Sequence, residues 1–435
     1  MANQENTAAG NKVFGKVAWR LMPFLCLCFV ICWLDRVNIS FAHLQFKSDL
    51  NINDASFGLI VGALSVGCLI FDIPGTFMLE KYGAKKTITR VMILWGVATI
   101  GTAFARTTGQ FYVFRFLLGA AEAGFFPGVI LYLTYWFPTA WRARISSRFI
   151  IAIGICGIVG GPLASWIMTH LNDVGGFRGW QWLFIFTGIL PLIIGVIAWF
   201  WLDDKPEDAR WLTEDEKQLV LQLLNEDKLR AKDNKKDNLI KALRDYRVWV
   251  IIISYVLTII CTGNVVNFWA PSIIKESGNI SLGSVGMLSS LPWIIGVAAM
   301  LIVSRLSDHY QERRWFFAGG VISIIAALII LPFVLHNAVY TVLTLVLMSS
   351  GYLVATAIYW TIPSQYFSEK SKAGCIALVS LFGQLGQILV PAFIGYLKNQ
   401  TGSITSALHF VTVFISLGLI LLLVGIPGNT LLKNK

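Results

Sequence analysis

The sequence predicts an all-α membrane protein with twelve transmembrane helices in two pseudo-symmetric six-helix bundles. Apolar residues make up 56% of the 435 residues, charged residues make up only 14%, and the mean hydropathy is +0.67. This charged share is about half that of a typical soluble domain. At about 20 residues per span, the chain has room for about a dozen transmembrane helices. The composition therefore excludes a soluble enzyme.

The apolar runs are grouped as six, a polar gap and six more. The first run continues through Asp35 without a small-residue cleavage signal, so we expect an uncleaved first span. The predicted spans are 21–44, 56–79, 88–105, 111–136, 146–169, 181–202, 247–274, 283–304, 315–334, 340–366, 373–397 and 404–428. The predicted organisation is a cytoplasmic amino terminus (1–20), a bundle (21–202), a cytoplasmic linker (203–246), a second bundle (247–428) and a cytoplasmic carboxyl terminus (429–435).

Basic residues are unevenly distributed among the predicted loops. The net charge of +11 would suit nucleic-acid binding, but most of the 35 lysines and arginines fall in the amino terminus, alternate loops and the carboxyl terminus. This pattern predicts that both termini are cytoplasmic, because positive charge is retained on that side of a membrane. We therefore expect the excess of basic residues to reflect insertion into the lipid bilayer and not binding of nucleic acid.

The seven cysteines lie inside apolar runs, which favours core packing over a disulfide framework. A thiolate site at Cys26, Cys28 and Cys32 is the alternative, but these residues lack histidine or acidic companions at metal-ligand spacing. We expect no metal and no cofactor.

The linker contains a capping box from Thr213 to Glu216, followed by an amphipathic pattern through Leu219, Leu223 and Leu224. We expect a helix that lies on the membrane surface or against the bundle; a regulatory partner site is the alternative.

An internal repeat relates the two halves. The segment 80–86 after the second span is echoed by 308–314 after the eighth, and Pro162 of the fifth span by Pro391 of the eleventh. A constant offset of about 229 residues predicts two bundles related by an axis along the membrane normal, with a substrate site between them. This is the architecture of a transporter.

Five charged residues fall inside predicted spans of the first half and away from the span ends: Asp35, Arg36, Asp72, Arg115 and Glu122. Placing each of these charges inside a membrane costs free energy, so each needs a partner of opposite charge, a water-filled cavity or a function. Arg115 and Glu122 are seven residues apart, so their side chains share one face of the helix and can both face the same cavity. Arginines suit a carboxylate substrate, and an anion that binds them would alter the proton affinity of Asp35 and Glu122.

Mutual neutralisation of these charges is the alternative interpretation. Asp72, beside Pro74, fits a conformational contact as well as proton handling. His43, at the end of the first span, is the histidine we would test as a proton relay.

These motifs resemble the major facilitator superfamily and, within it, the anion:cation symporter family. The segment 33–40 (WLDRVNIS) is similar to that family's first-helix signature, and 115–127 (RFLLGAAEAGFFP) to its fourth-helix signature. Segments 179–184, 209–213 and 268–274 resemble the bacterial tartrate-type or sugar-acid permease branch. The resemblance implies that Arg36 and Arg115 bind the substrate carboxylate and that Asp35 and Glu122 carry protons.

The resemblance also assigns gating residues. Salt bridges of the loop after the second span lock the cytoplasmic side in the outward-facing state of the superfamily. The positions that match this loop or its second copy, together with the intramembrane acid of the second span, are Asp72, Glu80, Gly83, Lys85, Lys86, Asp308 and Arg313. The second copy departs from the pattern, because Gln311 replaces its glycine.

Recognition beyond the carboxylate is expected from polar and aromatic residues in spans of the second half. The candidates are Asn264, Asn267, Tyr359, Ser380 and Gln384, with core packing as the alternative. Relatives usually have asparagines at the positions of Ser380 and Gln384, which puts tartrate itself in question. The second half offers no charge for a second carboxylate, which favours a hydroxylated or aromatic monoacid over a diacid.

We therefore expect a proton-coupled symporter that imports a small organic carboxylate by alternating access, acts as a monomer and is driven by the proton gradient. The resemblance and the short outer loops favour a bacterial inner membrane. An exporter, a Na-coupled carrier of organic anions and a non-transporting solute sensor are the alternatives. The sequence has no HExxH, GxSxG or P-loop motif that would indicate an enzyme.

Overall fold

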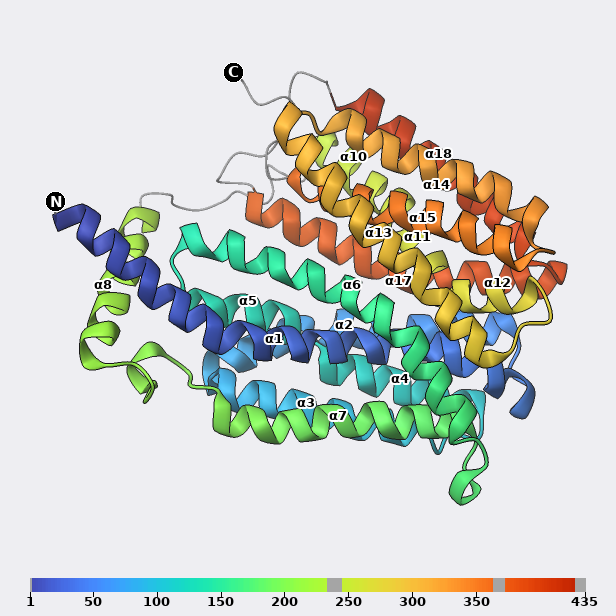
Figure 1. Ribbon diagram of the computed structural model, residues 1–435, viewed down its shortest axis with the longest axis horizontal. Helices are drawn as coiled ribbons and strands as arrows, with labels where there is room; N and C mark the ends of the chain where they lie inside the picture. Colours follow the sequence, from blue (N-terminus) through green and yellow to red (C-terminus); the bar gives the residue numbers. More distant parts are fainter. Residues whose placement is uncertain (1, 233–244, 363–371, 427–435) are drawn as a thin grey trace.

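The computed structural model describes residues 2–232, 245–362 and 372–426, and these residues form a bundle of long helices (Figure 1). Eleven helical segments among them are long and apolar enough to cross a membrane. Helix α3 is the twelfth; it packs between α4 and α7, and its first two turns, with Lys85, Lys86 and Arg90, lower its mean hydropathy.

The first bundle contains six spans, and the fourth of them is broken. The break lies at Ala123 and Gly124, where Gly124 adopts the left-handed conformation (φ 76°) and ends one helix before the next begins. A Cβ at Gly124 would stand 2.6 Å from the backbone of Gly75, so a larger residue does not fit there. The helices are α1 (Ala2–Asp49), α2 (Asp54–Tyr82), α3 (Ala84–Thr102), α4 (Thr108–Glu122), α5 (Phe125–Trp136), α6 (Thr139–His170) and α7 (Gly179–Trp201).

The second bundle begins with a span that contains two π-helical segments, Val256–Ile260 and Val265–Trp269. Segments of this kind widen the helix locally and are frequent at functional sites. The α-helices of this bundle are α10 (Tyr246–Tyr255), α11 (Cys261–Asn264), α12 (Ala270–Glu276), α13 (Leu282–Tyr310), α14 (Arg314–Val334), α15 (Ala338–Tyr359), α17 (Lys372–Thr401) and α18 (Ile404–Gly425).

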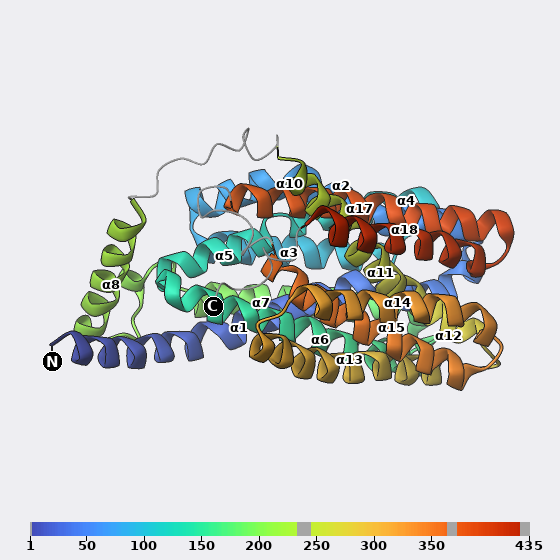
Figure 2. The same ribbon diagram turned by 90° about the horizontal axis from the view of Figure 1, so that it is seen from above.

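The linker helix α8 (Glu214–Lys232) packs on the start of α1, beyond the transmembrane bundle (Figure 2). Both capping-box bonds are present: the Glu216 backbone N–H donates to Thr213 Oγ1, and the Thr213 N–H donates to Glu216 Oε2. The Lys16 ammonium donates to the Glu216 carboxylate at 2.7 Å. Of the two predicted positions, the membrane surface or the bundle, the helix therefore takes the second, against the extended start of α1.

Several predicted boundaries differ from the observed ones. The predicted first span, 21–44, is the middle of a helix that runs from Ala2 to Asp49, because α8 supports its polar start. The predicted tenth span, 340–366, extends past the end of α15, and its last residues lie outside the described part of the chain. Residues 233–244 of the predicted linker and the predicted carboxyl terminus, 429–435, also lie outside it. The predicted eleventh span, 373–397, matches α17 closely.

The two bundles meet at the end of the molecule that lies away from α8, which we call the distal end. There, α2 packs against α17 and α6 against α13. A Cβ at Gly58 would stand 2.2 Å from the carbonyl oxygen of Pro391, and one at Gly161 would stand 2.6 Å from that of Gly286. One buried apolar core includes residues of both bundles here, whereas a second core contains only residues of the first bundle and of the linker with α8. The described conformation is therefore closed at the distal end.

Candidate functional site: a buried charge cluster beside an interbundle cavity

Arg36 of α1 and Glu122 at the end of α4 form an ion pair inside the first bundle. Arg36 Nε donates to Glu122 Oε2 at 2.7 Å; the Glu122 side chain is fully buried, whereas 27% of the Arg36 side chain is exposed. The remaining oxygen, Glu122 Oε1, accepts no hydrogen bond from a described nitrogen or oxygen donor and has the Cys32 thiol as a neighbour. The guanidinium carbon of Arg36 lies 5.8 Å from the centre of the Trp33 ring.

Asp35 points toward α3 and α7, away from Arg36. Its Oδ2 accepts hydrogen bonds from Trp95 Nε1 and Thr99 Oγ1, and Thr187 Oγ1 lies 3.5 Å from its Oδ1. These donors satisfy an ionised carboxylate in a buried position. Asp35 is consequently held by the first bundle alone.

Arg115 is 1% exposed and makes one long hydrogen bond, from Nη1 to the backbone carbonyl of Asp35 at 3.5 Å. Its Nε and Nη2 have no hydrogen-bond partner among the described residues. The nearest compensating charges are those of Asp35 and Glu122. Together with Arg36, these residues form a cluster of two cations and two anions, which we call the charge cluster.

The charge cluster has no formal net charge, so that uptake of a proton or of an anion changes its balance. If one carboxylate takes up a proton, one arginine charge is left uncompensated in a low-dielectric surrounding. An anionic substrate restores the balance. Arg115 and Glu122 do share a helix face, but the partner of Glu122 is Arg36, because the chain breaks directly after Glu122 and turns its carboxylate toward α1.

Asp72 of α2 caps the broken helix. Its Oδ1 accepts a hydrogen bond from the Gly124 backbone N–H at 3.0 Å, and Thr76 Oγ1 donates to the Asp72 carbonyl. A carboxylate at a helix start also interacts favourably with the helix dipole. This geometry favours the conformational role expected for Asp72 over the handling of protons.

The predicted gating loop forms a tight turn between α2 and α3. Gly83 has a φ of 86°, and the Lys85 backbone N–H donates to Asp204 Oδ1 at 2.9 Å. Glu80 and Lys86 are exposed. The conformation therefore depends on Asp204, which the sequence analysis did not single out.

In the second copy of this loop, Asp308 and Arg313 form an ion pair. Gln311, which replaces the expected glycine, adopts the left-handed conformation (φ 54°), so the turn is kept without a glycine.

The polar candidates of the second bundle are not brought together. Asn264 Nδ2 donates to the Ile260 carbonyl and lies 3.3 Å from Gln387 Oε1, and Tyr359 donates its hydroxyl to the Ile251 carbonyl at 2.6 Å. These contacts all lie within the second bundle, and Asn264 Oδ1 has no hydrogen-bond partner among the described residues. Ser380 is exposed on α17 and Gln384 is half-buried, and neither lines the cavity described next.

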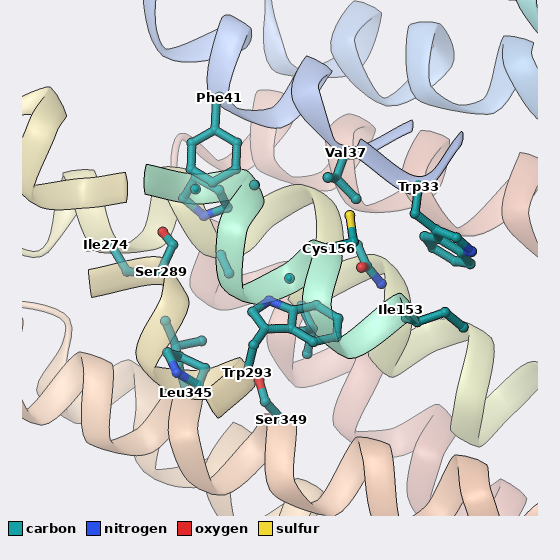
Figure 3. A pocket seen from close by; sticks show the side chains of 18 residues that line it. Trp33, Val37, Phe41, Ile153, Cys156, Ile274, Ser289, Trp293, Leu345 and Ser349 are labelled. Carbon is teal, nitrogen blue, oxygen red and sulfur yellow. The ribbon is translucent and has the colours of Figure 1, made fainter. Parts of the chain in front are cut away.

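A cavity lies between the bundles, beside the charge cluster (Figure 3). Its walls come from α1 and α6 of the first bundle and from α12, α13, α15 and the second π-segment of the other. Trp33 lines the cavity and also contacts the Arg36 guanidinium, so it connects the cavity to the charge cluster. Asn267, alone among the predicted substrate-binding residues, is in the wall.

Comparison with known proteins agrees with this architecture. The family model of the Major Facilitator Superfamily matches residues 25–391. The chain belongs to this superfamily. It is therefore a multi-pass membrane transporter of small molecules and not an enzyme.

Relatives in this superfamily cover almost the whole chain. A protein of Agrobacterium vitis named "Putative tartrate transporter" is 37% identical over 93% of this chain and 93% of its own. "Putative metabolite transport protein NicT" of Pseudomonas putida is 34% identical over 91% of this chain and 90% of its own. "Quinolone resistance transporter" of Acinetobacter baumannii is 33% identical over 94% of both chains.

The fold is also that of solved transporters of the superfamily. The crystal structure of a D-xylose-proton symporter superposes with a TM-score of 0.73 at 14% identity, over 94% of this chain and 98% of the other. The two-bundle prediction is thus confirmed.

Sequence reasoning missed an ionic contact across the distal end. Lys398 of α17 donates to Glu276 at 2.6 Å and lies 3.8 Å from Asp54 Oδ1 at the start of α2. Asp54 also pairs with Lys47 at 2.8 Å and lies 3.8 Å from His43 Nε2. The contact between Lys398 and Asp54 joins the two bundles. Sequence alone offers no signal for it, because all of these residues lie at ends of helices, where charges are ordinary.

Proposed function

We propose that this transporter is a proton-coupled symporter that imports a small organic carboxylate across a bacterial inner membrane, with both termini in the cytoplasm. The observation that carries the proposal is the charge cluster, in which the partly exposed Arg36 pairs with the buried Glu122 at 2.7 Å. The relatives named for tartrate and the distribution of basic residues support the carboxylate and the orientation, respectively.

Competition between Glu122 and the substrate carboxylate for Arg36 couples proton binding to substrate binding. Glu122 occupies Arg36 while it is ionised, and a proton on Glu122 releases the guanidinium for the substrate carboxylate. Arg115 cannot lose its charge at physiological pH and holds the cluster positive once a proton has entered. Proton and anion then cross together, and the cluster is neutral again when both leave.

The test is uptake of labelled acids (sugar acids, tartrate, nicotinate and hydroxyphenylacetate) into proteoliposomes with an inward proton gradient, against protein-free liposomes. Accumulation should be lost on adding a protonophore. Arg36→Gln should abolish binding and transport, whereas the matched control Arg178→Gln, at an arginine of which 54% is exposed, should retain both.

Glu122→Gln separates coupling from binding. The amide cannot exchange a proton, so exchange of substrate for substrate should persist while gradient-driven accumulation is lost. Accumulation that ignores pH and voltage would contradict the coupling. Export against the gradient, a sodium requirement, or binding without transport would favour the exporter, Na-coupled carrier and sensor, respectively.

A further inference from the structure

The cavity between the bundles is apolar, although the resemblance points to sugar acids and tartrate. Its aromatic walls are Trp33 and Phe41 of α1 and Trp293 of α13, and no charged residue is among the side chains that line it. Figure 3 shows Trp293 in the middle of these side chains, with Trp33 and Phe41 extending from the facing helix.

The polar groups of the cavity offer little to a hydroxylated ligand. Asn267, Ser289 and Ser349 are its polar side chains. The Asn267 amide donates to the Gly263 carbonyl at 2.6 Å, and the Ser289 hydroxyl donates to the Val285 carbonyl at 2.7 Å. One of the two amide N–H groups of Asn267 and the hydroxyl hydrogen of Ser289 are therefore already used within their own helices. A ligand with several hydroxyl groups would therefore bury some of them without partners, which is unfavourable.

The one charge that an occupant can reach lies at the edge of the cavity. Arg36 is partly exposed and contacts the Trp33 ring, whereas Arg115 is buried inside the first bundle. A ligand whose carboxylate binds Arg36 would have its body against Trp33 and directed toward Trp293. Trp293 reaches this position because α6 carries Gly157 there: a Cβ at Gly157 would stand 2.0 Å from the Trp293 ring.

We propose that the cavity selects monocarboxylates with an apolar, preferably aromatic, ring, and that Trp293 is a specificity-determining residue that packs against this ring. This proposal rests on the proposed transport of carboxylates and narrows its substrate class.

The test compares two acids that differ only in hydroxylation, cyclohexanecarboxylate and its tetrahydroxy counterpart quinate, by isothermal titration of the purified full-length protein. We expect cyclohexanecarboxylate and benzoate to bind at least tenfold more tightly than quinate or tartrate. Trp293→Ala should reduce this preference to less than threefold, and Trp19→Ala, at a tryptophan that is 82% exposed, should leave it unchanged.

The outcomes separate this inference from the proposed function. Equal or tighter binding of quinate or tartrate, or a preference that survives Trp293→Ala in folded protein, overturns the inference while carboxylate transport stands. If none of the four acids binds but a sugar acid accumulates in proteoliposomes, only the inference is overturned. If no acid of either panel binds or accumulates, both proposals fail.

Discussion

A methyl group at Gly58 should open the distal end of the transporter. The Cβ of an alanine there would stand 2.2 Å from the Pro391 carbonyl oxygen and 2.9 and 3.0 Å from two more backbone atoms of α17. Ordinary contacts of a Cβ begin at 3.4 Å. Backbone cannot rotate away as a side chain can, so α2 and α17 must separate by about 1 Å to accommodate the methyl group.

The cost falls only on conformations in which these helices touch. Overpacking of this kind costs about 1–3 kcal/mol. A penalty of this size changes the ratio of two conformations by about 5- to 150-fold. Gly58→Ala should therefore enrich conformations that are open at the distal end, and it should lower the rate of transport because the closed conformation becomes rare.

Double electron–electron resonance between spin labels at Ser48→Cys and Gln400→Cys would measure this shift. Both side chains are exposed and lie on different bundles at the distal end, while six of the seven native cysteines are buried and the seventh is half-buried. The matched control is Gly319→Ala, where a Cβ meets nothing within 4 Å. A distance distribution for Gly58→Ala identical to that of the control, in protein with unchanged thermal stability, would refute the reasoning.

Three further predictions follow from single contacts. Asp72→Ala removes the acceptor at the start of α5 and should destabilise the protein by about 1 kcal/mol in thermal unfolding, whereas Asp72→Asn, which keeps an acceptor, should cost less; equal losses would contradict a capping role. The Lys16 ammonium lowers the pKa of Glu216, so their contact stabilises the docking of α8 above the ordinary pKa of a glutamate and is lost as the pH falls through the lowered value. The protection of α8 against hydrogen exchange, relative to the intrinsic exchange rate at each pH, should accordingly fall in acid, and Lys16→Met should lower it by at most about fivefold at pH 7 and weaken this pH dependence. Lys398→Met removes the charge that links the bundles and should shift the spin-label distances in the same direction as the added methyl group; high salt, which screens the same contact, should shift the distances of the parent protein in that direction and leave those of Lys398→Met unchanged.

The twelve helices follow from the sequence because their cause is local. Apolar runs of membrane length need no knowledge of the rest of the chain, and the capping box of α8 lies within four residues, Thr213 to Glu216. The break in the helix after Glu122 can be predicted only in part from local sequence. Gly124 permits a left-handed residue, but the break also needs Asp72 from another helix to bind the exposed N–H.

The pairing within the charge cluster could not be read from helical periodicity. Asp35 and Arg36 are neighbours on α1 and point about 100° apart, so their partners depend on which helices pack on each side. The structure gives Asp35 the donors Trp95 and Thr99 and gives Arg36 the acid Glu122. Spacing within one helix identifies candidates for a shared cavity, whereas packing between helices decides which of them meet.

The charge cluster and the cavity divide recognition between the two bundles. All four charges belong to the first bundle, whereas Trp293, which faces the cavity, belongs to the second. A ligand held by its carboxylate at Arg36 and by its ring at Trp293 would contact both bundles at once, and its binding free energy would favour conformations in which both walls are near. An acid too short to reach Trp293 would bind Arg36 without this coupling. Transport rate should therefore fall more steeply than affinity as the body of the acid is shortened, since only contacts with both bundles can promote the exchange between conformations.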